Sequence, residues 1–153
     1  MKSFIENDKK NSKSCMTKFI NLLMIDGKKL RSEKIFLDVL KNLCEKDKNF
    51  SLKIFEKAFK NLGPLVTVRS VRVRRRSYQV PIPLKESQSL MIGMKWLINY
   101  CRKLKLTRSN SFSFYLSDQI FLASQKQGDL IKKKYDLHKL AKANRLFSNY
   151  RWF

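Results

Sequence analysis

In residues 66–83, VTVRSVRVRRRSYQVPIP, apolar and cationic side chains alternate, and the segment includes five arginines but no carboxylate. This period of two is typical of β-strands and predicts strands at 65–73 and 78–84. A two-stranded ribbon alone is only marginally stable, so it must pack on helices at its base and leave its tip free. The segment between the strands, Arg74 to Ser77, lacks the glycine or asparagine that a two-residue turn prefers. We therefore expect a longer, looser loop at the tip.

Helical periodicity governs the chain before this ribbon. Apolar residues three and four positions apart predict a first helix that ends near Gly27 and a second helix at about 31–45. A third helix follows, with Asn49 as its cap and Gly63-Pro64 as its end, because proline cannot continue a helix.

Three further helices are predicted after the ribbon. Ser87 can cap the fourth helix, which ends before the polar connection at 103–111. A fifth helix lies near 112–123, and the last begins within 130–137 and ends near 149. The predicted fold is therefore mainly α: a six-helix domain with a protruding two-stranded β-hairpin between helices three and four. One domain at 12–153, with its hairpin at 65–84, follows a short N-terminal arm at 1–11.

The chain carries a large excess of positive charge. Its 153 residues include 34 Lys plus Arg and 12 Asp plus Glu, for a formal net charge of +22. Residues 57–153 hold 21 of these cations and 4 of the acids, a net +17. Such an excess destabilises an isolated compact state through self-repulsion. Nucleic acid relieves it directly, through counterion release, so we expect the polyanion contact mainly on the second half.

Several groups of side chains are candidates for that contact. Arginine near the hairpin tip offers a planar fork of donors for phosphates and bases, and Tyr78 could stack on an unpaired base. The alternative is a solvated sheet edge with charges that prevent aggregation. Basic stripes at helical spacing equally describe solvated helix faces or contacts to a nucleic-acid backbone. The stripes are Lys53, Lys57 and Lys60; Lys95, Asn99 and Arg102; and His138, Lys142, Arg145 and Asn149.

Signals for catalysis or metal binding are poor. His138 is the single histidine, and a structural or RNA-facing role fits it better than general-base catalysis. The carboxylates are scattered, and the three cysteines are too far apart for a disulfide framework or a zinc site. We expect no enzyme activity, no cofactor and no membrane span. The rivals to RNA binding are a basic DNA-binding or architectural protein and an RNA-processing enzyme.

Four segments resemble the family of small-subunit ribosomal protein seven: FINLLMIDGKK (19–29), VRSVRV with YQVPIPL (68–84), MKWLINYCRK (94–103) and IKKKYDLHKLAKANRLFSNYRW (131–152). The likeness covers about residues 12–152, in the family's order and spacing. It implies six helices and a protruding hairpin. It also implies binding to the 3′ major domain of small-subunit ribosomal RNA, a role in assembly of the subunit head, and a place beside the transfer-RNA exit site and the messenger exit channel.

The resemblance also implies which residues act. Those expected to bind ribosomal RNA are Lys28, Lys29, Arg69, Arg72, Lys95, Arg102, Lys132, Lys133, Lys134, Lys142, Arg145 and Arg151. Those expected at the exit site, in contact with transfer RNA and messenger RNA, are Arg74, Arg75, Arg76, Ser77 and Tyr78. Neighbouring small-subunit proteins, numbers nine and eleven, are the implied protein partners.

The chain departs from the family in three places. Arg74-Arg75 replace the Gly-Gly usual in the hairpin turn, acids interrupt a shortened N-terminal arm, and Tyr135 stands where an acid is common. The heavy use of Lys, Asn, Ile and Phe suggests an AT-rich genome, and the start of the chain lacks the marks of a signal or transit peptide. These features are similar to mitochondrially encoded members, with a plastid or bacterial origin as the alternative.

Overall fold

The computed structural model describes residues 15–46, 51–107 and 109–152. Within these ranges, a helical segment at 15–23 is followed by α2 (Lys29–Lys46) and α3 (Ser51–Leu62). Strands β1 (Val66–Val73) and β2 (Arg76–Pro83) form an antiparallel hairpin. After it come α4 (Glu86–Thr107), α5 (Phe112–Ser124), α6 (Asp129–Ala143) and the 3₁₀-helix η1 (Arg145–Tyr150). The predicted fold class is confirmed: mainly helical, with the hairpin between the third and fourth helices.

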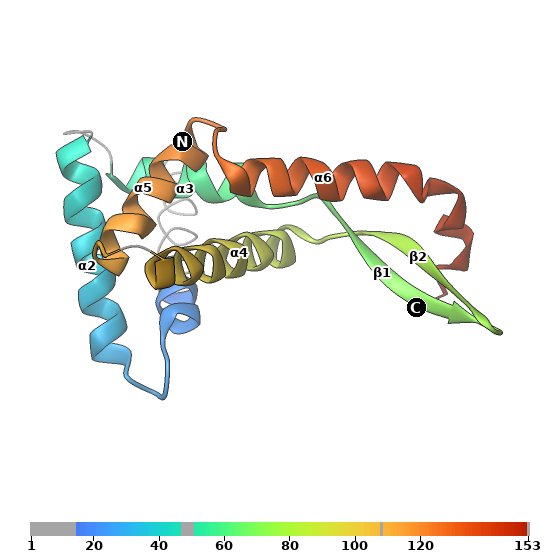
Figure 1. Cartoon of the computed structure of the whole chain (residues 1–153), viewed down its shortest axis with the longest axis horizontal. Coiled ribbons are helices and arrows are strands. Elements are labelled where there is room, and N and C mark those ends of the chain that lie inside the picture. The colour runs from blue at the N-terminus through green and yellow to red at the C-terminus, as the bar shows by residue number, and fades with distance from the viewer. Residues whose placement is uncertain (1–14, 47–50, 108, 153) are drawn as a thin grey trace, which may run out of the picture.

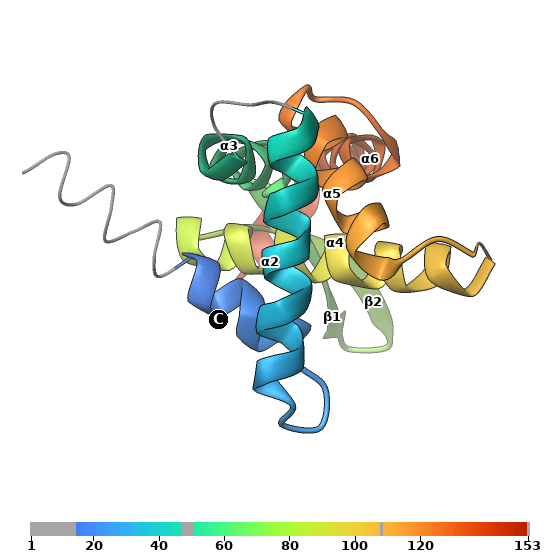
Figure 2. The ribbon, with the colours of Figure 1, turned by 90° about the vertical axis from the view of Figure 1, so that its left-hand side faces the viewer.

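The described part of the chain has a helical body and a long arm (Figure 1). The α2 helix stands across the end of the body opposite the hairpin, as the view from that end also shows (Figure 2). The α5 helix packs against α2, α3 and α4 and so ties the body together. The hairpin leaves the body beyond α4, and α6 runs out beside it before η1 turns back toward β2 (Figure 1).

Four phenylalanines form the centre of the core. Phe19, Phe36, Phe55 and Phe59 are all buried, and their ring centroids lie 4.6 to 5.9 Å apart in the pairs that touch. All five pairs of rings meet edge to face or tilted, as aromatic quadrupoles favour. The rings come from the 15–23 segment, α2 and α3, so this cluster joins the first three helices into one unit.

A close approach of backbones joins α3 to α4. A Cβ added to Gly93 would lie 3.3 Å from the Gly63 nitrogen and 3.3 Å from the Leu62 Cβ. A side chain at this position would push the neighbouring atoms of α3 away by a few tenths of an ångström, so glycine favours the close crossing of α4 over the end of α3. This crossing positions the hairpin, because the chain enters β1 directly after Gly63-Pro64.

Several predicted boundaries move in the structure. Ser87 does not cap α4: the Lys85 carbonyl accepts from the amides of Gln88 and Ser89, and the Lys85 amide donates to Gln88 Oε1 at 3.4 Å. The α4 helix also continues to Thr107, into the predicted polar connection at 103–111, because Leu104 extends its core-facing side. The predicted cap Asn49 lies outside the described residues, as does the predicted arm at 1–11.

The last predicted helix is divided in two. It begins at Asp129, earlier than predicted, and the α-helical part stops at Ala143. Both the amide and the side-chain Nδ2 of Asn144 donate to the Leu140 carbonyl, at 3.1 and 2.9 Å. Such a local bond from asparagine competes with continued helix. The residues after it form η1, which is therefore free to take a new direction. No helix among the described residues combines the length and apolarity needed to cross a membrane.

Candidate nucleic-acid interface

The hairpin has two different faces. Strand β1 pairs with β2 from Val66↔Pro83 to Val73↔Arg76. Because side chains alternate, one face carries Val71, Val73, Tyr78 and Val80 and packs toward α6 and η1. Pro81 and Pro83 fall on the other face. Leu84 donates to the Leu65 carbonyl, so alternation puts both prolines at positions that need no ladder donor. The two prolines therefore do not shorten β2, which runs from Arg76 to Pro83.

The turn is tighter than predicted. Val73 pairs directly with Arg76, so Arg74 and Arg75 alone connect the strands. Arg74 has φ 56°, in the left-handed region that non-glycine residues rarely occupy, whereas Arg75 does not. The expectation of a longer, looser loop at 74–77 is wrong, because the strand pairing continues far enough to impose the strained conformation. A long, flexible side chain such as arginine is thereby held at the very apex.

Cationic side chains surround this apex. The residues from Arg74 to Ser77 are all exposed, and so are Arg69 and Arg72 on β1. Arg72 and Ser77 form a pair on the outer face of the hairpin, whereas Arg69 and Arg76 project from the face that meets α6 and η1. The cations therefore point to both sides and beyond the end of the ribbon, as expected for contact with a polyanion that surrounds the tip.

The α6 helix and the residues after it continue the basic surface. Lys142, Arg145 and Arg151 are exposed, and so is Lys139, which the sequence stripes do not include. Neither residues 66–83 nor residues 137–152 contain an acid. We call the hairpin, the part of α6 from residue 137 onward, and η1 the basic arm. Its described residues carry positive charge with no carboxylate of their own to neutralise it.

His138 fixes the root of the hairpin. Its Nε2 accepts a hydrogen bond from the Leu65 amide at 3.1 Å, one residue before β1. Burial and the nearby charge of Lys134 both lower the pKa of His138 below its usual 6.5. The imidazole is thus kept neutral and able to accept, and the structural role expected for this histidine is the one that the geometry supports.

This bond predicts a pH effect on stability. Since the folded pKa of His138 is lowered, its contribution is fully present above pH 6.5 and is lost as the pH falls through the folded value. Between pH 7.5 and pH 5, wild-type protein should lose about 0.5–1 kcal/mol more stability than His138→Gln, the net worth of one hydrogen bond. Urea unfolding at the two pH values measures this. Equal losses in both proteins would show that the bond contributes nothing.

Lys134 belongs to the same structural junction. Its Nζ donates to the Asn61 carbonyl at 2.6 Å, at the C-terminal end of α3, where helix carbonyls lack partners. Burial, followed by the charge of Lys126, lowers the pKa of Lys134. Asn61 in turn donates through Nδ2 to the carbonyls of Ala123 and Ser124 at the end of α5. The primary role of Lys134 is therefore to join α3 to α6, and an RNA contact would be additional.

Three other predicted RNA-binding cations also have partners within the fold. Arg102 donates to the Leu23 carbonyl at 3.4 Å and so caps the helical segment at 15–23. Lys133 Nζ lies 4.8 Å from the centroid of the Trp96 ring, a cation–π contact. Lys132 Nζ lies 3.6 Å from Asp129 Oδ1, and Asp129 Oδ2 accepts a hydrogen bond from the Tyr100 hydroxyl at 2.7 Å. The exposed ion pair leaves Lys132 accessible, whereas Arg102 is half-buried.

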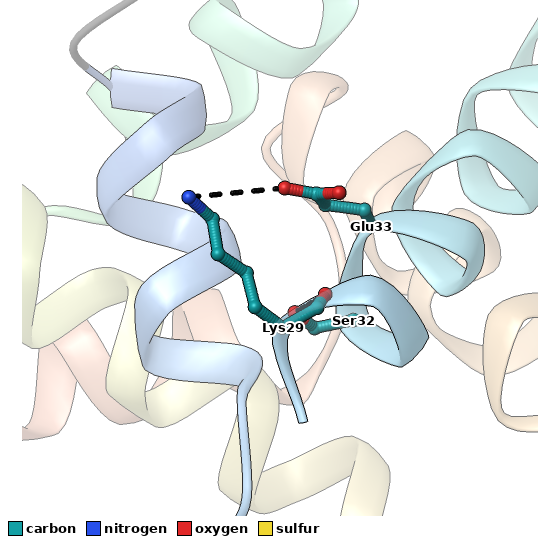
Figure 3. Close-up of polar contacts among 3 residues, drawn as sticks. All are labelled: Lys29, Ser32 and Glu33. Carbon is teal, nitrogen blue, oxygen red and sulfur yellow. Dashed lines mark hydrogen bonds and ion pairs between the residues drawn. The ribbon is translucent and has the colours of Figure 1, made fainter. Parts of the chain in front are cut away.

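The two lysines after the first helical segment lie on the body. Lys28 and Lys29 are exposed, and Lys29 Nζ is 3.9 Å from Glu33 Oε1 one turn later in α2 (Figure 3). Ser32 donates to the Lys29 carbonyl at 2.7 Å in the same turn. Exposed pairs of this kind are weak, so a phosphate can compete for Lys29. Lys95 is exposed on α4, and both α2 and α4 belong to the helical body from which the hairpin projects (Figure 1).

Tyr78 has aromatic neighbours that its position in the sequence does not reveal. Its ring centroid lies 5.0 Å from that of Phe147 and 5.0 Å from that of Tyr150, with an angle of 29° to the Tyr150 ring. All three side chains are half-buried. We call them the C-terminal aromatic cluster. In the structure the Tyr78 ring stacks on the chain's own Tyr150, and its stacking on a base stays a prediction.

The described residues contain no metal-binding group, and one of their three thiols is fully buried. Residues 15–46, 51–107 and 109–152 contain no group of three His, Cys, Asp or Glu able to hold a metal ion. Burial raises the pKa of Cys101 to about 12, with a smaller contribution from Asp118, which keeps this thiol protonated. All three cysteines are free.

Comparison with known proteins gives a consistent result. The family model described as Ribosomal protein S7p/S5e matches residues 1–145. The chain is similar to "Small ribosomal subunit protein uS7" of Leptospira biflexa, with 39% identity over 97% of this chain and 92% of the relative. The proteins of that name from Cytophaga hutchinsonii (37% identity, 99% and 96% coverage) and Wigglesworthia glossinidia brevipalpis (39%, 95% and 91%) are similar too.

Proposed function

The chain belongs to the ribosomal protein S7p/S5e family, and from this premise we propose that its basic arm binds small-subunit ribosomal RNA. As a member of this family it is a ribosomal protein of the small subunit and not an enzyme. The observation that carries the proposal is the basic arm itself, an extended, exposed and carboxylate-free surface on a chain of net charge +22. Because RNA phosphates release counterions when they bind such a surface, they stabilise a protein that repels itself when alone.

The proposal divides the predicted contacts by their role. The tip, Arg74 to Ser77 with Arg72, reaches into RNA at a distance from the helical body, and its guanidinium groups make bidentate contacts with phosphates. Lys142, Arg145 and Arg151 bind backbone along α6 and η1. Lys28, Lys29, Lys95 and Lys132 bind other RNA segments from the body, so that one rigid protein fixes several RNA helices relative to one another.

The finer location follows the family resemblance. We place the RNA target in the 3′ major domain, the hairpin tip at the transfer-RNA exit site beside the messenger path, and proteins nine and eleven among the neighbours. The single domain at 12–153 with an N-terminal arm at 1–11 belongs to the same proposal. The bacterial source of the relatives fits the bacterial alternative for location. The mitochondrial location suggested by composition has no support from them and stays a proposal.

A competition experiment tests RNA binding against the DNA-binding alternative. Purified chain is bound to a labelled 3′-domain fragment of small-subunit ribosomal RNA and challenged with unlabelled fragment, with transfer RNA, or with duplex DNA of equal phosphate content. We expect the unlabelled fragment to compete at least about tenfold better than the other two, because only its folded shape matches several basic sites at once. Equal competition by duplex DNA would contradict the proposal and favour an architectural DNA-binding protein.

A further inference from the structure

The last helical turn of the chain leaves the direction of α6 and packs on the hairpin. After the interruption at Asn144, η1 turns back toward β2 and contacts it, as Figure 1 shows at the far end of the molecule. Phe147 and Tyr150 are the residues that meet Tyr78. The end of β2 nearest the hairpin tip is therefore joined to η1 by side chains far from the helical body.

The need for such a contact follows from the shape of the hairpin. A two-stranded ribbon alone is marginally stable in water. Near its root this ribbon has the Leu65–His138 bond and the buried Val80, but beyond Val71 all side chains except Val73 and Tyr78 are exposed. Tyr78 lies two residues after Arg76, at the point where the ribbon would otherwise project unsupported.

We propose that Tyr78, Phe147 and Tyr150 are positioning residues, which fix the direction of the hairpin so that its tip and the cations of α6 and η1 present one surface to the RNA backbone. The functional part of this inference rests on the proposed RNA binding, whereas the fixed direction of the hairpin does not. Because the Tyr78 ring packs on the other two rings, its proposed effect on RNA binding is indirect: it holds the neighbouring arginines in position. The C-terminal aromatic cluster thereby couples the end of the chain to the tip of the hairpin.

Single substitutions with matched controls test this inference. Tyr78→Ser and Phe147→Ser each remove a ring from the cluster, and Tyr78→Phe keeps the ring. Leu146→Ser changes an 85% exposed side chain on the same 3₁₀-helix. Trypsin cleavage after Arg72 to Arg76, followed by mass spectrometry, reports hairpin opening. Cleavage after the half-buried Arg102 in α4 reports unfolding of the body, which these surface changes should not cause.

We expect Tyr78→Ser and Phe147→Ser to raise hairpin cleavage about five- to tenfold, because each change removes two of the three aromatic pairs in the cluster. RNA affinity should fall about threefold in both, and the double variant should be little worse than either single one, because both changes disrupt the same cluster. Tyr78→Phe and Leu146→Ser should behave like wild type in both measurements.

Three outcomes decide the matter. Wild-type cleavage rates in Tyr78→Ser would overturn the positioning role. RNA affinity that falls in Tyr78→Ser but not in Phe147→Ser would also overturn it, since Tyr78 would then contact a base directly. If the cleavage pattern is as expected but wild-type protein does not bind the RNA fragment, the fixed hairpin is supported and the proposed RNA binding fails.

Discussion

Replacement of Arg74, Arg75 and Arg76 by serine is expected to weaken binding to the ribosomal RNA fragment roughly 100-fold near 0.1 M salt, because each phosphate that is no longer neutralised keeps about one counterion on the RNA. The slope of log K against log salt should become less steep by about 2 to 3 for the same reason. The fold should persist, since all three side chains are exposed and the Val71 and Tyr78 contacts lie below them. Filter binding at several salt concentrations, with circular dichroism for the fold, measures both effects.

A control of equal charge distinguishes a site from general attraction. Arg31, Lys34 and Lys41 are exposed on α2, at the opposite end of the molecule from the hairpin, and outside the predicted contact set. Their triple replacement by glutamine also removes three charges, but it should weaken binding less than about fivefold, through the long-range field alone. Equal losses of affinity in the two triple variants would mean that net charge, and not the hairpin tip, determines affinity. Loss of the folded domain in the serine variant would show that the tip is structural.

The second large effect concerns the phenylalanine cluster. Phe55 is fully buried and contacts Phe19, Phe36 and Phe59. Phe55→Ala should lower the free energy of unfolding by about 3–5 kcal/mol, because it removes the transfer free energy of a ring and leaves a cavity among three others. Repulsion among the surplus cations already lowers the stability of the isolated chain. A further loss of this size is therefore expected to populate the unfolded state at ordinary temperature.

Urea unfolding at moderate salt measures the free energy of unfolding of wild-type protein and of Phe55→Ala. Leu52→Ala is the matched control, since Leu52 lies on the same helix and is 45% exposed. It should cost less than about 1 kcal/mol, because nearly half of its surface stays in water in the folded state and no closed cavity forms around it. A similar loss of stability for both variants would show that the cluster is not the centre of the core. Saturation with the RNA fragment should partly restore Phe55→Ala, because a ligand of the folded state stabilises it.

The sequence predicted the fold well wherever a periodic pattern decided the structure. The change from helical spacing to a period of two at Val66 located the hairpin between the third and fourth helices. The tight turn at Arg74 could not be predicted from local preference. Strand pairing from Val66↔Pro83 onward forces it, and that pairing depends on the whole hairpin. The break at Asn144 was similarly hidden, since a helical stripe runs through it to Asn149.

The candidate site was predicted in composition more than in detail. Spacing cannot distinguish a lysine that faces solvent from one that satisfies a helix end, because both occur at the same helical intervals. Lys134 and Arg102 prove to bond the carbonyls of Asn61 and Leu23, which lie more than seventy residues away in sequence. The spacing of residues is equally unable to reveal that the Tyr78 ring contacts the rings of Phe147 and Tyr150. Long-range partners of this kind become visible only when the chain is folded.

The salt dependence of RNA binding tests the central claim most directly. The affinity of wild-type protein for the 3′-domain fragment is measured between about 50 and 200 mM potassium chloride, where six to ten phosphate contacts predict a fall of roughly 10³–10⁵-fold. A fall within that range is the result expected of a protein with surplus cations that are neutralised by folded ribosomal RNA. An affinity that hardly changes with salt, or no binding to the fragment at 50 mM, would contradict it.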